Sequence, residues 1–456
     1  MNLKSINPYN GKQIATYKQH SQSQLTNKVQ ETHKAWISYQ QSTLAQRAVW
    51  MENLAQQLLL QQEHLAKIVT EEMGKPLQDG LAEVKKCAAV CQYYAKHAAA
   101  FLKDEIIDTD AKKSFISYQP LGIVLAIMPW NFPYWQVFRF LAPALMAGNA
   151  GLLKHASNVS ACALAIEKLV YDAGFPEDIF QVLLCESKNL AVVIENPLVK
   201  AITLTGSTQA GIQVAKKAGE LLKKTVLELG GSDAYIILED ADLEQAAEIC
   251  VNSRLINNGQ SCIATKRFIV VKTIEKAFTK LFVAKMKVKT YGNPTEPGID
   301  LGPMARTDLR DELHQQVIAS IKKGAKCVLG GFIPEDKGAF YPPTVLTQVK
   351  KGMPAYEDEL FGPVAAIISA KNEDDAIKIA NDTVFGLGGA IFTKDLAKGE
   401  LIAKEKLQAG SCFVNSLVKS DPRLPFGGIN QSGYGRELSL IGMREFLNIK
   451  TVYLQD

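Results

Sequence analysis

Ile123-Val124-Leu125-Ala126-Ile127-Met128 is the stretch that best predicts the fold. It is a continuous apolar run, which is typical of a strand that is covered on both faces of a parallel sheet. Further short strands are expected after it, separated by helical segments, at Gly151–Lys154, Gln181–Leu184 and Ala201–Leu204. Because strands alternate with helices in this way, the sequence predicts an α/β architecture.

The segment that precedes this run is different in character. In residues 22–103 apolar side chains recur at intervals of three and four, which predicts helices. The uncharged run Ser114–Phe138 is long enough to raise the question of a membrane span, but Pro120, Pro129 and Pro133 argue against a spanning helix. We therefore expect a cytoplasmic protein without a membrane partner.

Composition narrows the function classes. A chain of 456 residues can form two or three domains, and 47% hydrophobic and 21% charged residues are ordinary for a globular protein. The net charge of +4, without a dense Lys/Arg run, does not favour nucleic-acid binding. The eight cysteines are too scattered for a disulfide framework, and the six histidines lack metal-ligand spacing, so no metal site is predicted.

Cys262 is the candidate nucleophile. It follows Asn257-Asn258-Gly259-Gln260-Ser261, a polar, turn-forming run that can present a thiol instead of burying it. The alternative is that Cys262 packs as a small hydrophobic residue. Because the thiolate is the reactive form, a nucleophilic role also needs a neighbouring group that helps the thiol to ionise.

Two other turns carry candidate groups. Thr205–Gly211 connects an expected strand to a helix, and glycines there allow a phosphate to approach backbone amides, although the spacing is not the usual dinucleotide fingerprint. In Glu228-Leu229-Gly230-Gly231 one carboxylate stands at the end of an apolar strand, where a raised pKa suits a general base. A capping role for Glu228 is equally compatible with the sequence.

Six short segments lie along the chain in a fixed order: Pro129–Pro133, Gly206–Gly211, Glu228–Gly231, Gly259–Cys262, Glu359–Pro363 and Pro425–Gly428. Their order resembles that of the aldehyde dehydrogenase superfamily, and the resemblance extends from Asn7 to Tyr453. Within that superfamily the chain is most similar to the short succinate-semialdehyde dehydrogenases. The further cues are Lys154–Asn158, Arg139 and Lys419–Arg423.

The resemblance implies a domain organisation. It comprises two Rossmann-type α/β domains and a small β arm through which subunits associate. Residues 1–107 and 120–229 would form the cofactor-binding domain, residues 230–430 the catalytic domain, and residues 108–119 and 437–456 the oligomerisation arm. The arm implies a homodimer or a homotetramer.

The resemblance also implies a reaction, the NAD(P)-dependent oxidation of succinate semialdehyde to succinate through a thiohemiacetal and a thioester. Cys262 would attack the aldehyde, the Asn131 amide and the Cys262 N–H would hold the oxyanion, and Glu228 would deprotonate the hydrolytic water. Glu359 would anchor the nicotinamide ribose and Phe361 would support the same end of the cofactor. The implied cofactor-binding residues are Ile127, Met128, Pro129, Trp130, Lys154, Ser157, Gly206, Ser207, Leu229, Glu359 and Phe361.

Two departures from the family pattern bear on the cofactor. Relatives that prefer NAD often carry Glu where this chain has Ser157, and proline is usual where it has His155. Lys154 attracts a 2′-phosphate and the Ser157 hydroxyl can donate to it, whereas a Glu would repel it. We therefore expect NADP to be favoured over NAD. For His155 the simplest interpretation is that it packs or faces solvent.

Arg139 bears on the substrate. If a helix begins at Asn131, Arg139 lies two turns later on the same face and could grip a carboxylate bidentately. The alternative is that Arg139 pairs with an acid inside the protein. The first interpretation predicts a small aldehyde that carries a carboxylate. The implied substrate-binding residues are Arg139, Phe132, Trp135, Ser420 and Phe426.

Two other functions stay open at this point. A related small aldehyde such as glutarate semialdehyde differs by one methylene, which a site discriminates only weakly. A cysteine thioesterase is an alternative of a different class. It would use Cys262, Glu228 and the oxyanion donors, but it would have no use for Glu359, Phe361 or the turn at residues 206–211.

Overall fold

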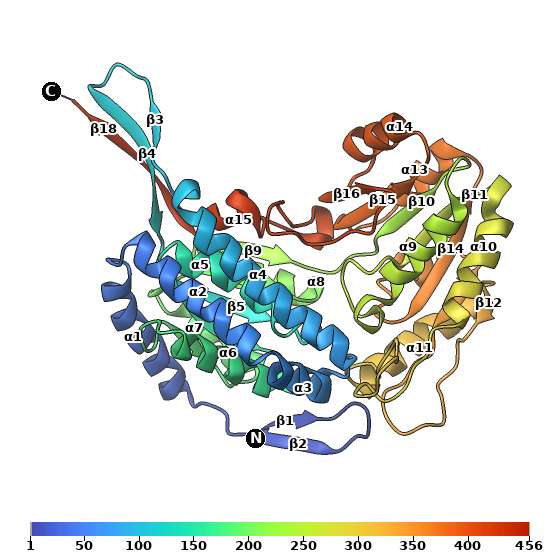
Figure 1. The fold of residues 1–456 in the computed structure, drawn as a ribbon, viewed down its shortest axis with the longest axis horizontal. Coiled ribbons are helices and arrows are strands. Elements are labelled where there is room, and N and C mark those ends of the chain that lie inside the picture. Colours follow the sequence, from blue (N-terminus) through green and yellow to red (C-terminus); the bar gives the residue numbers. More distant parts are fainter. Residues whose placement is uncertain (1, 456) are drawn as a thin grey trace.

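A computed structural model describes residues 2–455 as two α/β units and a projecting β arm (Figure 1). The chain begins with the antiparallel pair β1 (Leu3–Ile6) and β2 (Gln13–Tyr17). The helices predicted for residues 22–103 follow, and the αL residue Gly74 ends the third of them. They are α1 (Gln22–Tyr39), α2 (Leu44–Leu60), α3 (Gln62–Met73) and α4 (Leu77–Phe101).

The first α/β unit is built on a six-stranded sheet in the order β17-β9-β8-β5-β6-β7. Its strands are parallel except for β17, which pairs antiparallel with β9. The strands are β5 (Ile123–Met128), β6 (Ala150–His155), β7 (Phe180–Val182), β8 (Val199–Thr205), β9 (Lys224–Glu228) and β17 (Gly433–Tyr434). The connecting helices are α5 (Trp135–Met146), α6 (Ser160–Asp172), α7 (Ala191–Glu195) and α8 (Thr208–Glu220).

The second unit is built on a seven-stranded sheet in the order β12-β13-β14-β11-β10-β15-β16, parallel except for β12. The strands are β10 (Ala234–Ile237), β11 (Arg267–Val271), β12 (Lys326–Leu329), β13 (Thr344–Thr347), β14 (Val364–Ala370), β15 (Gly388–Phe392) and β16 (Ser411–Val414). The helices are α9 (Leu243–Leu255), α10 (Lys272–Lys287), α11 (Thr307–Lys322), α12 (Pro354–Glu357), α13 (Glu373–Asn381) and α14 (Leu396–Leu401).

The cores follow from these sheets. One buried apolar cluster surrounds the six-stranded sheet, and two others lie on the two faces of the seven-stranded sheet. Strand β5 is buried along nearly its whole length, as the apolar run of its sequence predicts. The predicted α/β fold class is therefore confirmed. No described helix is both long and apolar enough to cross a membrane.

The arm is a three-stranded antiparallel sheet in the order β18-β4-β3, and it projects from the first unit (Figure 1). Its strands are β3 (Glu105–Ile107), β4 (Lys113–Pro120) and β18 (Leu447–Leu454). The residues that form the arm differ in two places from those that the sequence analysis assigned to it. The strand Glu105–Ile107 pairs with β4 although the division placed it before the arm, and α15 (Ser439–Arg444) packs on α5 because Met443 belongs to the core of the first unit.

Candidate active site

Two cavities meet at Cys262. One has a volume of about 260 Å³ and the other about 270 Å³, and Cys262 and Gln136 line both of them. The thiol is thus open to one cavity that is lined partly by α4 and α5 and to another that is lined partly by the turns after β5 and β8. A single group can therefore act on molecules that enter from either side.

The loop that carries Cys262 is held by an unusual backbone path. Asn257, Asn258 and Gly259 have φ values of 56°, 60° and 74°, so three successive residues adopt the left-handed region. The Asn257 amide donates to the carbonyl oxygens of Asn131, at 2.7 Å, and Gln260, at 3.0 Å. A Cβ atom on Gly259 would lie 2.4 Å from the Gly362 backbone. The Asn-Asn-Gly sequence therefore suits this turn because asparagine tolerates the left-handed region and glycine leaves the space free.

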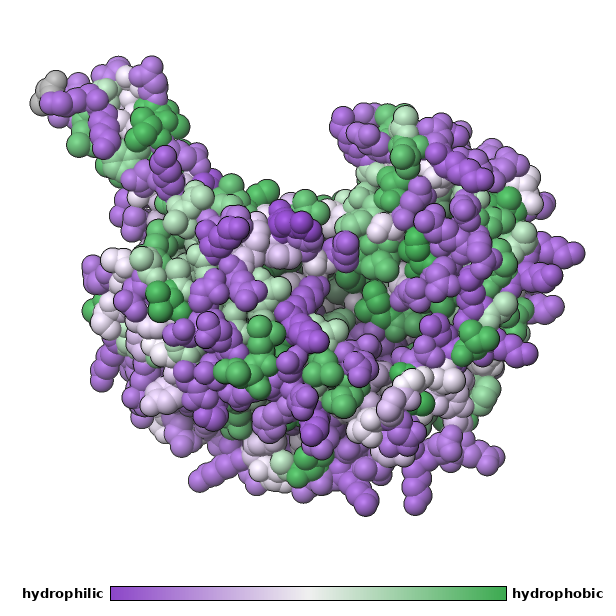
Figure 2. Space-filling model, in the orientation of Figure 1, coloured by the Kyte–Doolittle hydropathy of each residue, from purple (hydrophilic) through white to green (hydrophobic). Residues whose placement is uncertain are grey.

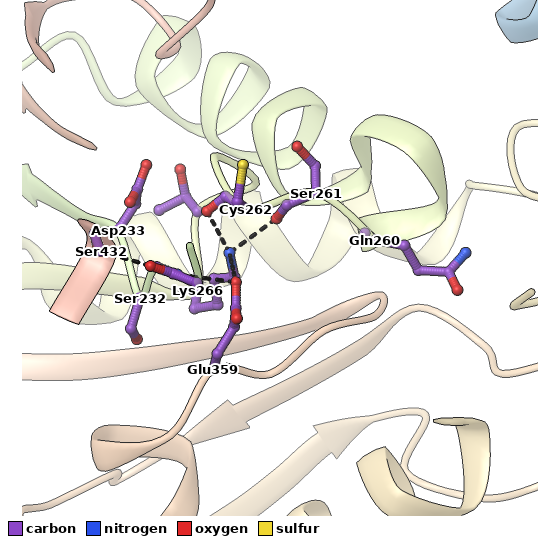
Figure 3. Close-up of polar contacts among 12 residues, drawn as sticks. Ser232, Asp233, Gln260, Ser261, Cys262, Lys266, Glu359 and Ser432 are labelled. Atoms are coloured by element: carbon purple, nitrogen blue, oxygen red, sulfur yellow. Dashed lines mark hydrogen bonds and ion pairs between the residues drawn. The ribbon is translucent and has the colours of Figure 1, made fainter. Parts of the chain in front are cut away.

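A buried lysine fixes the loop from below (Figure 3). The Lys266 Nζ donates to the carbonyl oxygens of Ser261, at 2.9 Å, and Cys262, at 2.6 Å, and pairs with Glu359 Oε1 at 3.2 Å. Glu359 Oε1 also accepts from the N–H of Gly231 at 3.0 Å. Lys266 therefore links the nucleophile loop to Glu359, which the sequence assigns to the cofactor, and sequence reasoning missed it because its position carries no motif.

The charges around Cys262 set its protonation state. Burial raises the pKa of the Cys262 thiol to about 12, and the nearby cations of Lys266 and Arg139 act in the opposite direction. The resting site consequently holds a neutral thiol at physiological pH. A reaction at Cys262 must therefore remove its proton as the substrate is attacked.

Glu228 ends strand β9 and is buried, with Arg139, Arg436 and Glu437 as the nearby charges. Within residues 2–455 neither of its carboxyl oxygens has a hydrogen-bond partner. Burial raises the pKa of Glu228 well above its usual value, and the Arg139 charge only partly offsets this effect. A Cβ atom on Gly427, whose φ is +157°, would lie 2.7 Å from Glu228 Oε1. The glycine thus leaves room beside a carboxyl group that is held ready to exchange a proton.

Asn131 lies beside the nucleophile loop. Its Nδ2 donates to the Gln260 carbonyl oxygen at 3.1 Å, while its Oδ1 is buried without a partner among the described residues. One hydrogen of the amide nitrogen remains for a further acceptor. The amide therefore stands where it can donate to an oxygen that develops charge near the loop.

The cavity on the cofactor side contains most of the residues that the sequence assigns to a cofactor. Those that line it are Pro129, Trp130, Gly206, Ser207, Leu229, Glu359 and Phe361. Thr205 of the predicted turn also lines it, but other lining residues were not foreseen, because they come from a face of the distant helix α11. They include Leu309, Glu312, Leu313 and Gln316.

Four predicted cofactor residues do not line this cavity. Ile127 and Met128 lie at the end of β5, and Ile127 pairs in register with Lys154 of β6. Ser157 begins the 3₁₀ turn that follows β6. Lys154 is buried, its pKa is lowered by burial, and no carboxylate of the described residues pairs with it. These groups lie at the carboxyl edge of the sheet, where parallel α/β sheets bind ligands.

His155 packs inside the protein. Its Nε2 lies 2.9 Å from the Pro133 carbonyl oxygen, and its Nδ1 accepts from the Ala156 N–H at 2.9 Å. Burial lowers the pKa of the ring to about 4, so the ring is neutral and Nε2 is the donor. Of the two roles expected for His155, packing inside the protein or facing solvent, the structure shows packing.

The lining of the cofactor-side cavity suits part of a nucleotide cofactor. Ser207 caps α8, so the positive end of that helix borders the cavity. A Cβ atom on Gly230 would come within 2.5 Å of Glu359 Oε2, so glycine keeps this wall open. Trp130 and Phe361 meet edge to face with their ring centroids 5.7 Å apart. The residues present therefore fit a nucleotide cofactor.

The substrate-side cavity is lined by the five residues predicted for it: Phe132, Trp135, Arg139, Ser420 and Phe426. The geometry differs from the expectation, however. Helix α5 begins at Trp135 rather than at Asn131, so Arg139 lies one turn from Trp135. The Arg139 Nε pairs with Glu437 Oε2, and its Nη2 donates to Thr205 Oγ1 at 3.3 Å.

The expectation of an unpaired arginine is therefore corrected. Arg139 is 2% exposed and Glu437 is 4% exposed, and a guanidinium buried to this degree needs a countercharge. Of the two interpretations left open by the sequence, the internal ion pair is observed. Phe426 completes the arrangement with its ring centroid 4.7 Å from the guanidinium carbon.

The rest of this cavity escaped sequence reasoning. One side is formed by a face of α4, whose sequence carries no motif, and the others come from the nucleophile loop and the segment before Ser420. These residues are Asp79, Ala82, Glu83, Lys86, Ile256, Asn257, Ser261, Ile263, Val418 and Lys419. The only available signal was the recurrence of polar residues at helical spacing within α4.

Comparisons with known proteins agree with this geometry. The model of the aldehyde dehydrogenase family matches residues 1–452. A "Probable succinate-semialdehyde dehydrogenase" of the NADP(+) type from Synechocystis sp. is 46% identical over 454 residues, and a succinate-semialdehyde dehydrogenase of the NADP(+) type from Mycobacterium leprae is 46% identical over 457. Each alignment covers both chains in full. The crystal structure of succinic semialdehyde dehydrogenase from Streptococcus pyogenes with NADP+ superposes with a TM-score of 0.97 at 36% identity, again over all of both chains.

Proposed function

The chain belongs to the aldehyde dehydrogenase family, and we infer that it oxidises succinate semialdehyde to succinate with NADP as the hydride acceptor. The observation that carries this proposal is the position of Cys262 between two cavities. The cofactor-side cavity is bordered by the start of α8 and by Glu359, and the substrate-side cavity carries cationic and hydroxyl groups. An aldehyde dehydrogenase needs this arrangement, whereas a thioesterase needs only the second cavity.

In this proposal Cys262 and Asn131 carry out the first half of the reaction, the oxidation of the aldehyde to a thioester. The Cys262 thiol gives up its proton to solvent as its sulfur attacks the aldehyde carbon, and the C=O double bond opens to the C–O⁻ single bond of a thiohemiacetal. The Asn131 Nδ2 and the Cys262 N–H donate to the oxygen that becomes negative. Bound in the neighbouring cavity, NADP supplies a nicotinamide ring that accepts a hydride. Glu359, whose carboxylate is fixed by Lys266, holds the ribose of that ring, and Phe361 supports the same end.

The second half belongs to Glu228. A thioester on Cys262 is cleaved by water, and the water must lose a proton as it attacks. The carboxylate form of Glu228 takes that proton, and the raised pKa makes the group a stronger base than an exposed glutamate. Succinate then leaves and the Cys262 thiol is restored.

For the cofactor we propose a preference for NADP over NAD. Lys154, which has no ion-pair partner among the described residues, and the Ser157 hydroxyl both suit a 2′-phosphate. Ile127 and Met128 border the same edge of the sheet. The curated relatives of the NADP(+) type and the Streptococcus pyogenes complex with NADP+ support the same choice.

We also propose that the six-stranded unit binds the cofactor, that the seven-stranded unit carries the nucleophile, and that the arm joins subunits into a dimer or tetramer. The arm presents apolar side chains among hydrophilic ones (Figure 2), namely Ile106, Ile107, Ile449, Tyr453 and Leu454. A small sheet with exposed apolar residues is suited to covering by another copy. The cytoplasmic location remains a prediction from the sequence.

One assay tests the function. The purified protein is given succinate semialdehyde, glutarate semialdehyde or butyraldehyde with NADP or NAD, and the absorbance of the reduced nicotinamide is followed. We expect the highest kcat/KM with succinate semialdehyde and NADP. Glutarate semialdehyde should be discriminated by roughly 1 to 3 kcal/mol, the usual effect of one methylene. Hydrolysis of acyl thioesters without any cofactor-dependent aldehyde oxidation would favour the thioesterase instead.

A further inference from the structure

The peptide group that joins Ser261 to Cys262 carries the N–H that the proposed reaction assigns to the oxyanion. No acceptor within residues 2–455 takes a hydrogen bond from this N–H. The peptide is trans, and in a planar trans peptide the C=O and N–H groups point in opposite directions. The direction of the Cys262 N–H is therefore set by the group that holds the Ser261 carbonyl oxygen.

Lys266 holds that oxygen (Figure 3). Its Nζ donates to two successive carbonyl oxygens of the loop, to Ser261 at 2.9 Å and to Cys262 at 2.6 Å. The Ala264 N–H donates to the same Ser261 oxygen at 3.1 Å. Hydrogen bonds in such a chain polarise one another, so a cation on the carbonyl oxygen makes the N–H of the same peptide a stronger donor.

The position of Lys266 is itself fixed by the sheet. Its N–H donates to the Asp233 carbonyl oxygen at 3.2 Å, and its own carbonyl oxygen accepts from the Ala366 N–H of β14 at 2.9 Å. The side chain is 0% exposed, and the third bond of its ammonium is the ion pair with Glu359 Oε1 at 3.2 Å. Three acceptors thus surround Nζ, which matches the three N–H groups of a charged lysine.

The ammonium also acts on the thiol. Burial raises the pKa of Cys262, and among the nearby cations Lys266 opposes this effect most, ahead of Arg139. For Lys266 itself burial lowers the pKa, and the Glu359 carboxylate opposes that effect. The charged groups that face this lysine and thiol are Asp233, Arg254, Glu359, Arg139 and Glu228.

We propose that Lys266 is a positioning residue for the first half of the reaction, which aims the Cys262 N–H at the aldehyde oxygen and keeps a positive charge beside the sulfur. This inference rests on the function proposed above and deepens its oxidative half. Lys266 lines neither cavity, so it acts through the loop and not on the substrate or the cofactor. Glu359 provides the countercharge that a buried ammonium needs.

The first experiment measures the thiol without aldehyde or cofactor. Iodoacetamide alkylates the thiolate, and peptide mass analysis follows Cys262 apart from the other cysteines. In Lys266→Met the rate at about pH 8.5 should fall roughly tenfold or more, because loss of a nearby cation raises the thiol pKa by about one unit or more. Lys266→Arg keeps the charge and should recover part of the rate. The matched control Lys272→Met changes an exposed lysine of the same unit and should behave as wild type.

The second experiment follows the burst of reduced NADP with succinate semialdehyde by rapid mixing. In Lys266→Met the burst should be about 10- to 100-fold slower, since a misdirected oxyanion donor loses much of its effect. The KM for the aldehyde should change by less than about threefold, because Lys266 does not line the substrate-side cavity. Chemical denaturation verifies folding. Should Lys266→Met not fold, Lys266→Gln, which keeps an N–H donor without the charge, should show the same slowing of alkylation.

Glu359→Gln separates the hold on the loop from the ion pair. It removes the carboxylate and leaves both bonds from Lys266 to the loop, so alkylation of Cys262 should not slow. If it slows alkylation as much as Lys266→Met does, the ion pair is responsible and the assignment is wrong.

The remaining outcomes are equally decisive. A wild-type burst rate in Lys266→Met, whether or not alkylation slows, would show that Lys266 does not position the donor, and the proposed function would stand. A wild-type protein that reduces no NADP with succinate semialdehyde would overturn the proposed function. The alkylation experiment would then still test the effect of Lys266 on the thiol, because it uses neither aldehyde nor cofactor.

Discussion

The cavities on the two sides of Cys262 are built in different ways. The cofactor side is formed largely by turns that follow parallel strands, such as Pro129–Trp130 after β5 and Gly206–Ser207 after β8. The substrate side is formed by faces of α4 and α5 and by the loop that carries Ser420. A turn is specified by a few consecutive residues, whereas a helix face becomes part of a site only through tertiary packing. Chemistry shared by a family can thus be local in sequence, while specificity depends on distant segments.

The largest effect is expected where the two cavities meet. Cys262→Ala removes the nucleophile that both halves of the reaction require, so turnover should fall by a factor of roughly 10³ or more. Neither cavity is otherwise altered, so NADP should bind within about twofold of the wild-type affinity, as measured by calorimetry. Appreciable steady-state oxidation by the variant would show that Cys262 is not the nucleophile.

Glu228→Gln separates the two halves of the reaction. Glutamine has the shape of the neutral carboxyl but cannot take a proton from water, so hydrolysis should slow by about 10²- to 10⁴-fold. The first turnover does not need this base, and rapid mixing should reveal one equivalent of reduced cofactor per active site. Glu359→Gln is the comparison variant. It changes a residue of the cofactor-side cavity, so it should lower the amplitude or rate of the burst of reduced cofactor. The absence of any burst in Glu228→Gln would assign Glu228 to the first half.

The difference between the cavities also explains what the sequence could predict. The apolar run of β5, the turn at Gly206 and the loop before Cys262 are local patterns. The structure has the strand and the helix after the turn that they predict, and the half-buried thiol lines both cavities. The predicted cofactor residues follow such turns, and most of them share one cavity. The residues that determine each of these features lie within about ten positions of one another in the sequence. Hydrophobic periodicity and turn-forming residues are therefore enough to predict them.

Lys86, Lys266 and the partner of Arg139 could not be found in this way. Glu437 lies far along the chain from Arg139, and no pattern in either segment indicates that the two will pair. The sequence could state only that a buried arginine needs a partner. The argument from spacing likewise assumed a helix that begins at Asn131. The helix begins at Trp135, where the Glu83 carboxylate accepts from the N–H groups of Tyr134 and Trp135, and nothing in the sequence indicated this contact.

Arg139→Gln tests whether the substrate side depends on this buried pair. The change leaves the Glu437 carboxyl without its partner, and breaking a buried ion pair typically costs about 3 to 5 kcal/mol of stability. Chemical denaturation should show this loss, and oxidation of both succinate semialdehyde and butyraldehyde should decline. The double change Arg139→Leu and Glu437→Leu should recover much of the stability. If Arg139→Gln is fully stable and loses only the charged substrate, Arg139 binds the carboxylate directly.

Ser157→Glu is the corresponding test on the cofactor side. A carboxylate at this position would repel the 2′-phosphate of NADP and could accept hydrogen bonds from the ribose of NAD. The ratio of kcat/KM values for NADP and NAD should therefore fall by roughly tenfold or more. Ser157→Ala removes the hydroxyl without adding charge and should have a smaller effect. A wild-type enzyme that already prefers NAD strongly would contradict this assignment while leaving the family chemistry intact.

The smallest effect concerns pH and acts on the substrate side. The pKa of Lys86 is lowered to about 8, chiefly by burial and then by Arg139, while Cys87, Glu83 and Asp421 act in the opposite direction. Lys86 lines the substrate-side cavity, so below that pKa its ammonium attracts a substrate carboxylate, and above it the charge is lost. The KM for succinate semialdehyde should therefore rise about fourfold between pH 7 and pH 8.5, as one deprotonation with this pKa requires.

Butyraldehyde provides the internal control for this pH effect. Its KM does not depend on the Lys86 charge, so any change that both aldehydes share reports another group, such as Cys262 or Glu228. The ratio of the two KM values isolates Lys86. In Lys86→Arg that ratio should be flat over the same range, because a guanidinium stays protonated there. A ratio that is flat already in the wild type, or that still rises in Lys86→Arg, would show that another group controls recognition of the carboxylate.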